Sequence, residues 1–284
     1  MEPLIHVTNL KHVYPDKTAV HLGGLDFAVE AGQRVVIIGP NGAGKTTLLA
    51  HLLGLLAPTE GTVTVLGCRP HESFRKIRGK VGVVFQQVDE QIIGPRVYDD
   101  IAFSLRNDGL PEDQVLQKVK DVAASLQISH LLEKIPHYLS GGEKKKVALA
   151  GALVTLPQIL ILDEPFLSLD PESRREMIRL LNHLSREHEV SLVITTHDME
   201  VVGDLADVVY VFHQGSIIAR GTPREIFGQV NMLKEANLEP PVLAELFHRL
   251  HQKGMKVPVP QSMAEAEAWL IKALQNKENP EDIG

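Results

Sequence analysis

Residues 39–47 of the chain, GPNGAGKTT, match the phosphate-binding pattern GxxxxGK[ST]. This stretch directly follows an apolar run, VVIIG, and it precedes a helix predicted over residues 45–56, which must end before Pro58. Glycines let backbone N–H groups turn toward an anion, and the start of a helix adds a partial positive charge there. The pattern predicts that Lys45 reaches the β- and γ-phosphates of a nucleotide and that the Thr46 hydroxyl ligates Mg²⁺.

An acidic pair follows a second apolar run, ILILDEP at residues 159–165. A strand that delivers Asp163 to its carboxyl end can place a carboxylate on Mg²⁺. Glu164, one residue later, can position or deprotonate an attacking water. In isolation such a pair could instead merely cap a turn, but beside a phosphate-binding loop it favours nucleotide hydrolysis.

A third motif, LSGGEKKK at residues 139–146, precedes a helical run. Ser140, Gly141 and Gly142 would form a second helix N-terminus that is able to bind phosphate. Taken alone, a Ser-Gly-Gly turn is more simply a helix cap, and the three lysines after it are a solvated run.

The composition fits a globular protein of 284 residues, with 44% hydrophobic and 23% charged residues. A net charge of -7 provides no basic field for nucleic acid, and the single cysteine, Cys68, cannot form an internal disulfide, which suits a reducing compartment. The N-terminus lacks the pattern of a secretory signal. The longest apolar region, residues 147–162, is interrupted by polar residues and proline, so we expect attachment to a membrane to need a partner.

The elements that must position these motifs form an alternating α/β pattern. Helical periodicity dominates residues 89–156, where Pro111 starts a helix whose apolar face carries Val115, Val119, Val122 and Leu126. We expect a first domain over residues 1–228 and a helical C-terminal extension over residues 229–284. The strands are predicted at residues 4–10, 25–30, 33–39, 61–67, 81–86, 158–164, 191–196 and 208–212.

Over residues 4–230 the chain resembles the ABC ATPases, because all of that family's motifs occur in its order. Tyr14 resembles the aromatic residue that stacks on adenine, Gln86 the Q-loop glutamine, and His197 the switch histidine. Ser168-Leu169-Asp170 resembles the D-loop. The resemblance implies a P-loop NTPase fold, with a RecA-like core, an antiparallel β subdomain, an inserted helical subdomain and the small helical extension.

The resemblance also implies a mechanism. Two chains would dimerise head to tail and hold each ATP between one chain's Lys45 loop and the other's LSGGE motif. Glu164, His197 and Gln86 would be catalytic, and Thr46, Gln86 and Asp163 would hold Mg²⁺. The implied nucleotide-binding residues are Tyr14, Gly39, Pro40, Asn41, Gly42, Ala43, Gly44, Lys45, Thr46, Thr47, Ser140, Gly141 and Gly142. Glu143 departs from the family, which most often has Gln at this position of the motif.

Two further stretches resemble the energy-coupling factor branch, whose members import cobalt, nickel or vitamins. They are VFQQVDEQI at residues 84–92, with an Asp-x-Gln element, and residues 236–254, which resemble a C-terminal extension that helps the ATPases dimerise. This implies a peripheral protein at the cytoplasmic face of the cell membrane, with a second ATPase chain (a copy or a paralogue) and integral membrane subunits as partners. A cobalt/nickel transporter is the first interpretation, and a vitamin or other ABC transporter is the alternative. A non-transport ABC ATPase acting on DNA or ribosomes is a remote one, since residues 47–160 carry no sustained heptads.

Overall fold

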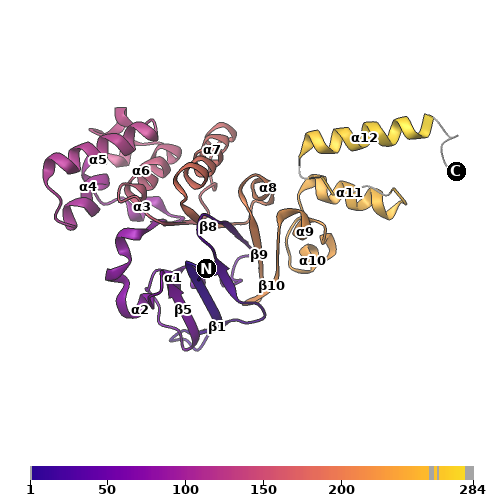
Figure 1. Ribbon diagram of the computed structural model, residues 1–284, viewed down its shortest axis with the longest axis horizontal. Helices are drawn as coiled ribbons and strands as arrows, with labels where there is room; N and C mark the ends of the chain where they lie inside the picture. The colour runs from indigo at the N-terminus through magenta and orange to yellow at the C-terminus, as the bar shows by residue number, and fades with distance from the viewer. Residues whose placement is uncertain (1, 256–258, 261, 279–284) are drawn as a thin grey trace.

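The computed structural model describes residues 2–255, 259–260 and 262–278. A mixed six-stranded sheet has the order β10-β9-β4-β8-β7-β6, in which only β10 is antiparallel to its neighbour (Figure 1). Its strands are β4 (Arg34–Ile38), β6 (Val81–Val84), β7 (Ile159–Asp163), β8 (Ser191–Thr196), β9 (Val208–His213) and β10 (Ser216–Gly221).

A second, antiparallel sheet is centred on β1, which pairs with the three other strands. It consists of β1 (Ile5–Val13), β2 (Ala19–Leu22), β3 (Phe27–Val29) and β5 (Glu60–Val65). The sequence did not predict β2 or β10, which lie beside turns and have partly exposed residues.

The helices lie between and after the strands. They are α1 (Lys45–Leu52), α2 (Pro70–Ser73), α3 (Val88–Gln91), α4 (Val97–Asn107), α5 (Glu112–Ser125), α6 (Gly141–Leu153), α7 (Pro171–His188), α8 (Val202–Leu205), α9 (Pro223–Phe227), α10 (Val230–Glu235), α11 (Val242–Gln252) and α12 (Met263–Glu278). Short 3₁₀ helices lie at Phe74–Lys76, Arg78–Lys80, Ser129–Leu131, Pro136–Tyr138 and Met199–Val201.

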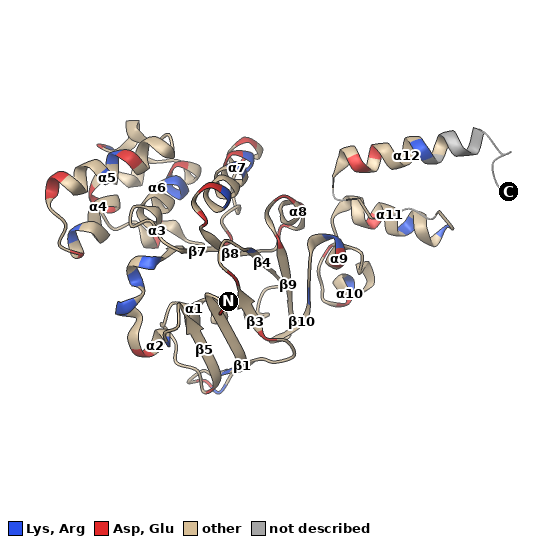
Figure 2. Cartoon of the chain, in the orientation of Figure 1, with Lys and Arg blue, Asp and Glu red and all other residues tan. Residues whose placement is uncertain are grey.

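The six-stranded sheet is covered on both faces, which explains its apolar strands. Along β4, Val36 and Ile38 join a core formed with the helices from α4 to α9. Val35 and Ile37 point the other way, into a core shared with α1 and the antiparallel sheet. The charged residues lie mainly on the helices, and the strands of the large sheet are nearly free of them (Figure 2). This arrangement confirms the predicted α/β P-loop fold.

The predicted helix over residues 45–56 was too long, because α1 ends at Leu52. Gly54 has φ +68° and its N–H donates to the His51 carbonyl at 3.1 Å. A side chain at Gly54 would lie 2.6 Å from the Pro70 carbonyl oxygen. Close packing against α2 therefore ends the helix with a left-handed glycine.

The C-terminal helices project from the body of the protein (Figure 1). The helical pattern after residue 228 divides into α10 and α11, since Asn237 has φ +57° and Pro241 immediately precedes α11. Glu200 accepts the Val242 N–H at the start of α11 at 2.9 Å. The Arg224 guanidinium pairs with Glu265 on α12. These polar contacts join the extension to the core.

Candidate functional site

The glycine-rich loop joins the carboxyl end of β4 to the start of α1. Gly39 is required here because a Cβ would lie 2.5 Å from the Phe212 carbonyl oxygen on β9. Gly44 has φ +102° and directly precedes α1, where no side chain caps the helix. Within the described residues, the N–H groups of Gly42, Gly44, Lys45 and Thr46 donate to no acceptor. These free donors at a helix N-terminus form a cradle that suits phosphate.

Lys45 lies inside this loop with 7% of its surface exposed. Its ammonium donates to the carbonyls of Gly39 at 2.6 Å and Pro40 at 3.1 Å. Burial lowers the pKa of Lys45, while the charges of Glu164 and Asp163 act in the opposite direction. The ammonium and the free N–H groups of the loop thus form a cationic end of the site, and the charges of Asp163 and Glu164 act on it.

Asp163 is the last residue of β7, opposite Thr195 on β8. The Thr195 hydroxyl donates to Asp163 Oδ1 at 2.5 Å and also accepts the Glu164 N–H at 3.1 Å. Burial raises the pKa of Asp163, and Lys45 and the Thr195 hydroxyl partly offset this. Sequence analysis missed Thr195, although a hydroxyl residue two positions before His197 on a buried strand was an available signal.

Glu164 begins the turn after β7 with φ +47°, an uncommon conformation for this residue type. Its carboxylate accepts hydrogen bonds from His197, at 2.8 Å from Nδ1 and 3.3 Å from the backbone N–H. The His197 ring is 55% exposed whereas the Glu164 side chain is 9% exposed. The pair therefore holds a mostly buried carboxylate against a histidine ring that solvent can reach.

Three oxygen groups predicted to hold Mg²⁺ come from separate elements: Thr46 on α1, Asp163 on β7, and Gln86 after β6. Hydroxyl, carboxylate and amide oxygens are the donors that this hard cation prefers, so the residues fit the ion. Gln91 fixes the segment before Gln86, because its side chain accepts the Phe85 N–H and donates to the Val83 carbonyl, both at 2.9 Å. Gln91 is the glutamine of the Asp-x-Gln element.

Tyr14 lies beside the loop. Its hydroxyl and that of Thr47 are 2.8 Å apart, and its ring meets His12 edge to face with centroids 4.5 Å apart. The hydrogen bond places Tyr14 next to the start of α1, which is compatible with contact to the base of a nucleotide.

Ser140, Gly141 and Gly142 form the start of α6. The Ser140 hydroxyl and Glu143 make a capping box, in which the carboxylate accepts the Ser140 N–H and O–H, each at 2.8 Å. No hydrogen bond or ion pair joins these three residues to the Lys45 loop in the part of the chain that the structure describes. The site thus brings together the residues from Tyr14, the loop, β7 and β8, and leaves the LSGGE motif elsewhere.

Known proteins match this chain over most of its length. A family model described as ABC transporter matches residues 22–167, and a model described as AAA domain, putative AbiEii toxin, matches residues 133–203. The energy-coupling factor transporter ATP-binding protein EcfA of Methanothermobacter thermautotrophicus is 43% identical over 274 residues, which cover 95% of this chain and 88% of that protein. The EcfA of Methanocaldococcus jannaschii is 41% identical over 260 residues, covering 90% of this chain and 92% of its own.

Solved structures show the same relationship. CbiO1 from Clostridium perfringens, described as part of the ABC transporter complex CbiONQ, has a TM-score of 0.75 and 34% identity, and the match covers 87% of this chain and all of that one. A dimeric ATP-binding cassette with ADP and Pi, in a post-hydrolysis state, has a TM-score of 0.70 and 25% identity, covering 78% and 99%.

No helix in the described part of the chain is long and apolar enough to cross a membrane. The motifs, the fold and these relatives agree: the chain belongs to the ATP-binding proteins of ABC transporters, in the energy-coupling factor branch, and is an ATPase subunit whose hydrolysis of ATP is coupled to transport.

Proposed function

We propose that two such chains close head to tail on ATP and that this closure drives an importer of cobalt or nickel ions. The observation that carries the proposal is the hydrogen bond of 2.8 Å between Glu164 and His197 Nδ1, beside the open N–H groups of the Lys45 loop. This geometry supports hydrolysis rather than binding alone, because a carboxylate oriented by a second group can act as a general base toward water.

Each residue has a distinct task in the proposed reaction. The loop N–H groups and Lys45 bind the phosphates and stabilise the charge that develops on them. Glu164 accepts a proton from the attacking water. His197 holds that carboxylate and contacts the γ-phosphate. Mg²⁺, held by Thr46, Asp163 and Gln86, would neutralise phosphate charge when bound.

The second half of the site is proposed to come from another chain. Ser140–Gly142 lie at a helix N-terminus and make no bond to their own chain's loop, which leaves them available to a partner's ATP. In the C-terminal extension, Val242 is 73% exposed, Met263 72% and Leu274 65%. Exposed apolar side chains of this size favour contact with another protein surface, so we propose that residues 229–284 help the chains to dimerise.

Membrane subunits are proposed to contact the segment around Gln86, at the cytoplasmic face of the membrane. Resemblance to the cobalt/nickel members supports the choice of cargo, and a vitamin transporter of the same branch is the alternative. Uptake of radioactive Co²⁺ or Ni²⁺ by cells that express the full transporter should depend on ATP turnover. Uptake of a vitamin with no uptake of either ion would overturn the proposed cargo.

The central test uses Glu164→Gln. This variant keeps the shape of the carboxylate but cannot accept the proton, so it should bind Mg·ATP, turn over at least about a hundredfold more slowly, and accumulate as a closed dimer. Size-exclusion chromatography with Mg·ATP detects the dimer. A nucleotide-bound variant that elutes as a monomer would contradict the shared site.

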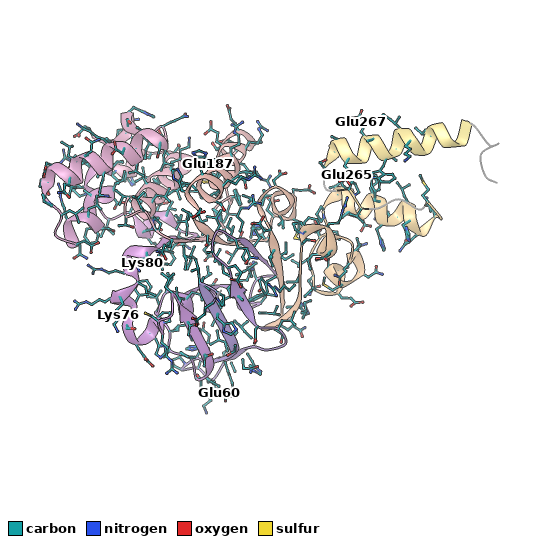
Figure 3. The ribbon with its side chains drawn as sticks, in the orientation of Figure 1. Glu60, Lys76, Lys80, Glu187, Glu265 and Glu267 are labelled. Atoms are coloured by element: carbon teal, nitrogen blue, oxygen red, sulfur yellow. The ribbon has the colours of Figure 1, made fainter. Side chains whose placement is uncertain are left out.

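The matched control is Glu187→Gln. Glu187 is an exposed acid on α7, outside the proposed site (Figure 3). This control should keep normal turnover and should accumulate no dimer beyond that of the unaltered chain. Equal dimer accumulation in both variants would mean that the loss of one negative charge, rather than the trapping of ATP, favours the dimer.

A further inference from the structure

Lys145 differs from the two lysines that flank it on α6. Lys144 pairs with Asp89 at 2.5 Å, and Lys146 pairs with Glu176 at 2.8 Å. Lys145 is 7% exposed and forms no ion pair with an acidic side chain within the described residues. A buried ammonium is costly unless hydrogen bonds compensate it, so its partners indicate its role.

The Lys145 ammonium donates to two backbone carbonyls, those of Pro165 at 2.8 Å and Leu167. Both carbonyls belong to the turn that begins with Glu164. This turn is unusual along its length, because Glu164 has φ +47° and Ser168 has φ +62°. Backbone in such conformations persists only where the surroundings hold it.

The local bonds of the turn are few. Leu167 N–H donates to the Glu164 carbonyl and Leu169 N–H to the Phe166 carbonyl, both at a long 3.2 Å. Lys145 therefore supplies the only side-chain hydrogen bonds to the carbonyls of residues 165 and 167 in the described chain. Burial lowers its pKa to about 8, and the negative charge of Glu164 acts against this shift. The cation and the carboxylate are thus close enough to interact.

The position of Lys145 in the first turns of α6 connects it to the start of the same helix. Ser140–Gly142 start α6, and Lys145 lies little more than one turn later. In the proposed dimer, the start of α6 contacts the ATP of the partner's loop, whereas Glu164 serves the ATP of its own chain's loop. Lys145 stands between the two sites within one chain.

We propose that Lys145 is a positioning residue that fixes the Glu164 turn of its own chain against α6. Through it, movement of the LSGGE motif on one ATP is transmitted to the carboxylate that hydrolyses the other. The proposal rests on the shared site proposed above, but the anchoring of the turn within one chain can be tested separately from it.

The first experiment measures the anchor in the nucleotide-free chain. Lys145→Met removes the donors and keeps a similar apolar volume, and Lys146→Met is the matched control on the same helix. Hydrogen exchange at residues 164–169 should become at least about tenfold faster in Lys145→Met, because the charge-assisted hydrogen bonds that hold the turn are lost. Exchange in Lys146→Met should stay unchanged. Equal exchange in both variants would overturn the proposal.

Turnover gives a second readout that separates positioning from general loss of structure. Lys145→Met should lower kcat about tenfold while KM for Mg·ATP changes less than twofold, since the Lys45 loop is untouched. Lys145→Gln keeps neutral N–H donors in place of the charged ones, so its kcat should fall between those of the unaltered chain and Lys145→Met. If kcat of Lys145→Met stays within twofold of normal, or KM and kcat change together, Lys145 does not position Glu164.

Mixed dimers decide which site Lys145 serves. Two differently tagged copies are paired with Mg·ATP, one carrying Glu164→Gln so that only the other copy's Glu164 is active. When Lys145→Met is placed in the copy whose Glu164 is active, turnover should fall about tenfold. When it is placed in the copy that carries Glu164→Gln, turnover should fall by less than threefold. The reverse order would show that Lys145 supports Ser140–Gly142 instead. If no mixed dimer forms, the shared site fails, and hydrogen exchange alone then decides the anchor.

Discussion

The starts of α1 and α6 are both glycine-rich turns suited to phosphate, yet they differ in how the helix is capped. At α1, Gly44 precedes the helix, no side chain caps it, and the N–H groups remain free. At α6, Ser140 and Glu143 cap the helix reciprocally. The first end is left open for an anion. At the second, the Ser140 N–H and hydroxyl and the Glu143 N–H already have partners that an ATP phosphate must displace or share, whereas the Gly141 and Gly142 N–H groups have no acceptor within the described residues.

The difference explains how the LSGGE motif can keep its structure in a single chain before a partner's nucleotide binds to it. Exposed helix N-termini normally gain about 1 kcal/mol from a side-chain cap. The start of α1 has no such cap. A bound ligand would have to supply the missing acceptors there. The start of α6 is therefore partly satisfied by its own side chains without ligand, whereas the start of α1 has no side-chain cap and needs a ligand to supply acceptors.

The groups buried along the two helices differ as well. In α6, Lys145 meets backbone carbonyls. In α1, His51 is 1% exposed, and neither ring nitrogen makes a regular hydrogen bond within the described chain. Lys145 is a buried cation with partners, whereas His51 is a buried ring without them. We therefore expect the two groups to respond differently to pH.

The largest expected effect comes from removing the cation of the open end. Lys45→Ala should weaken ATP binding by at least about a hundredfold, since charge-assisted hydrogen bonds to phosphate contribute up to about 3 kcal/mol. Binding of a fluorescent ATP analogue measures this. Lys120→Ala, an exposed lysine on α5, is the control and should bind normally. Binding by Lys45→Ala within threefold of normal would show that the loop N–H groups alone hold the nucleotide.

Sequence patterns predicted most of what the open end does. VVIIG, ILILDE and SLVITT were predicted as strands, and they lie side by side as β4, β7 and β8. Because parallel strands end at one edge of the sheet, the loop at Gly39–Thr47, the acidic pair Asp163–Glu164 and His197 follow neighbouring strand ends, although the role of His197 was expected only from the resemblance. The fold class followed from the same alternation of strands and helices.

Contacts made by single side chains could not be predicted this way. Lys145 has the same sequence context as Lys144 and Lys146. It is buried only because α6 turns this side of the helix toward the protein interior. Thr195 is marked in the sequence only as a hydroxyl residue two positions before His197, and its contacts with Asp163 and Glu164 come from the pairing of β7 with β8. The end of α1 depended on the approach of Pro70, which lies far along the chain from Gly54. Each was decided by tertiary packing, on which local propensity has little influence.

The second prediction concerns the buried histidine of α1. Burial, with a smaller effect of nearby His12, lowers the pKa of His51 to about 4, although the Leu56 carbonyl slightly favours the proton. The unfolded chain has a pKa near 6.5 here and binds the proton first. Stability is therefore full above about pH 6.5 and is lost as the pH falls toward 4, by about 3 kcal/mol in total.

Urea unfolding of the unaltered chain and of His51→Leu at pH 7 and pH 4 tests this. The carboxylates and the histidines near His51, namely His12 and His71, are present in both proteins. Their contributions to the pH dependence of stability therefore cancel in the difference. The unaltered chain should lose about 3 kcal/mol more than His51→Leu between the two pH values. Parallel losses would show that His51 accepts a proton in the folded state.

The smallest expected effect is at the capped end. Hydrogen bonds from the Ser140 N–H and hydroxyl lower the pKa of Glu143, so this carboxylate is ionised at neutral pH. Glu143→Gln can still accept the Ser140 N–H but carries no charge. Loss of a favourable charge at a helix N-terminus should cost less than about 1 kcal/mol of stability.

Removal of repulsion with the partner's ATP should lower KM for Mg·ATP about two- to fivefold. Steady-state ATPase assays at low and high salt measure it. The gain should shrink as salt rises, because screening already weakens the repulsion, and an unchanged or higher KM at low salt would mean that Glu143 turns away from the partner's phosphate when the dimer closes.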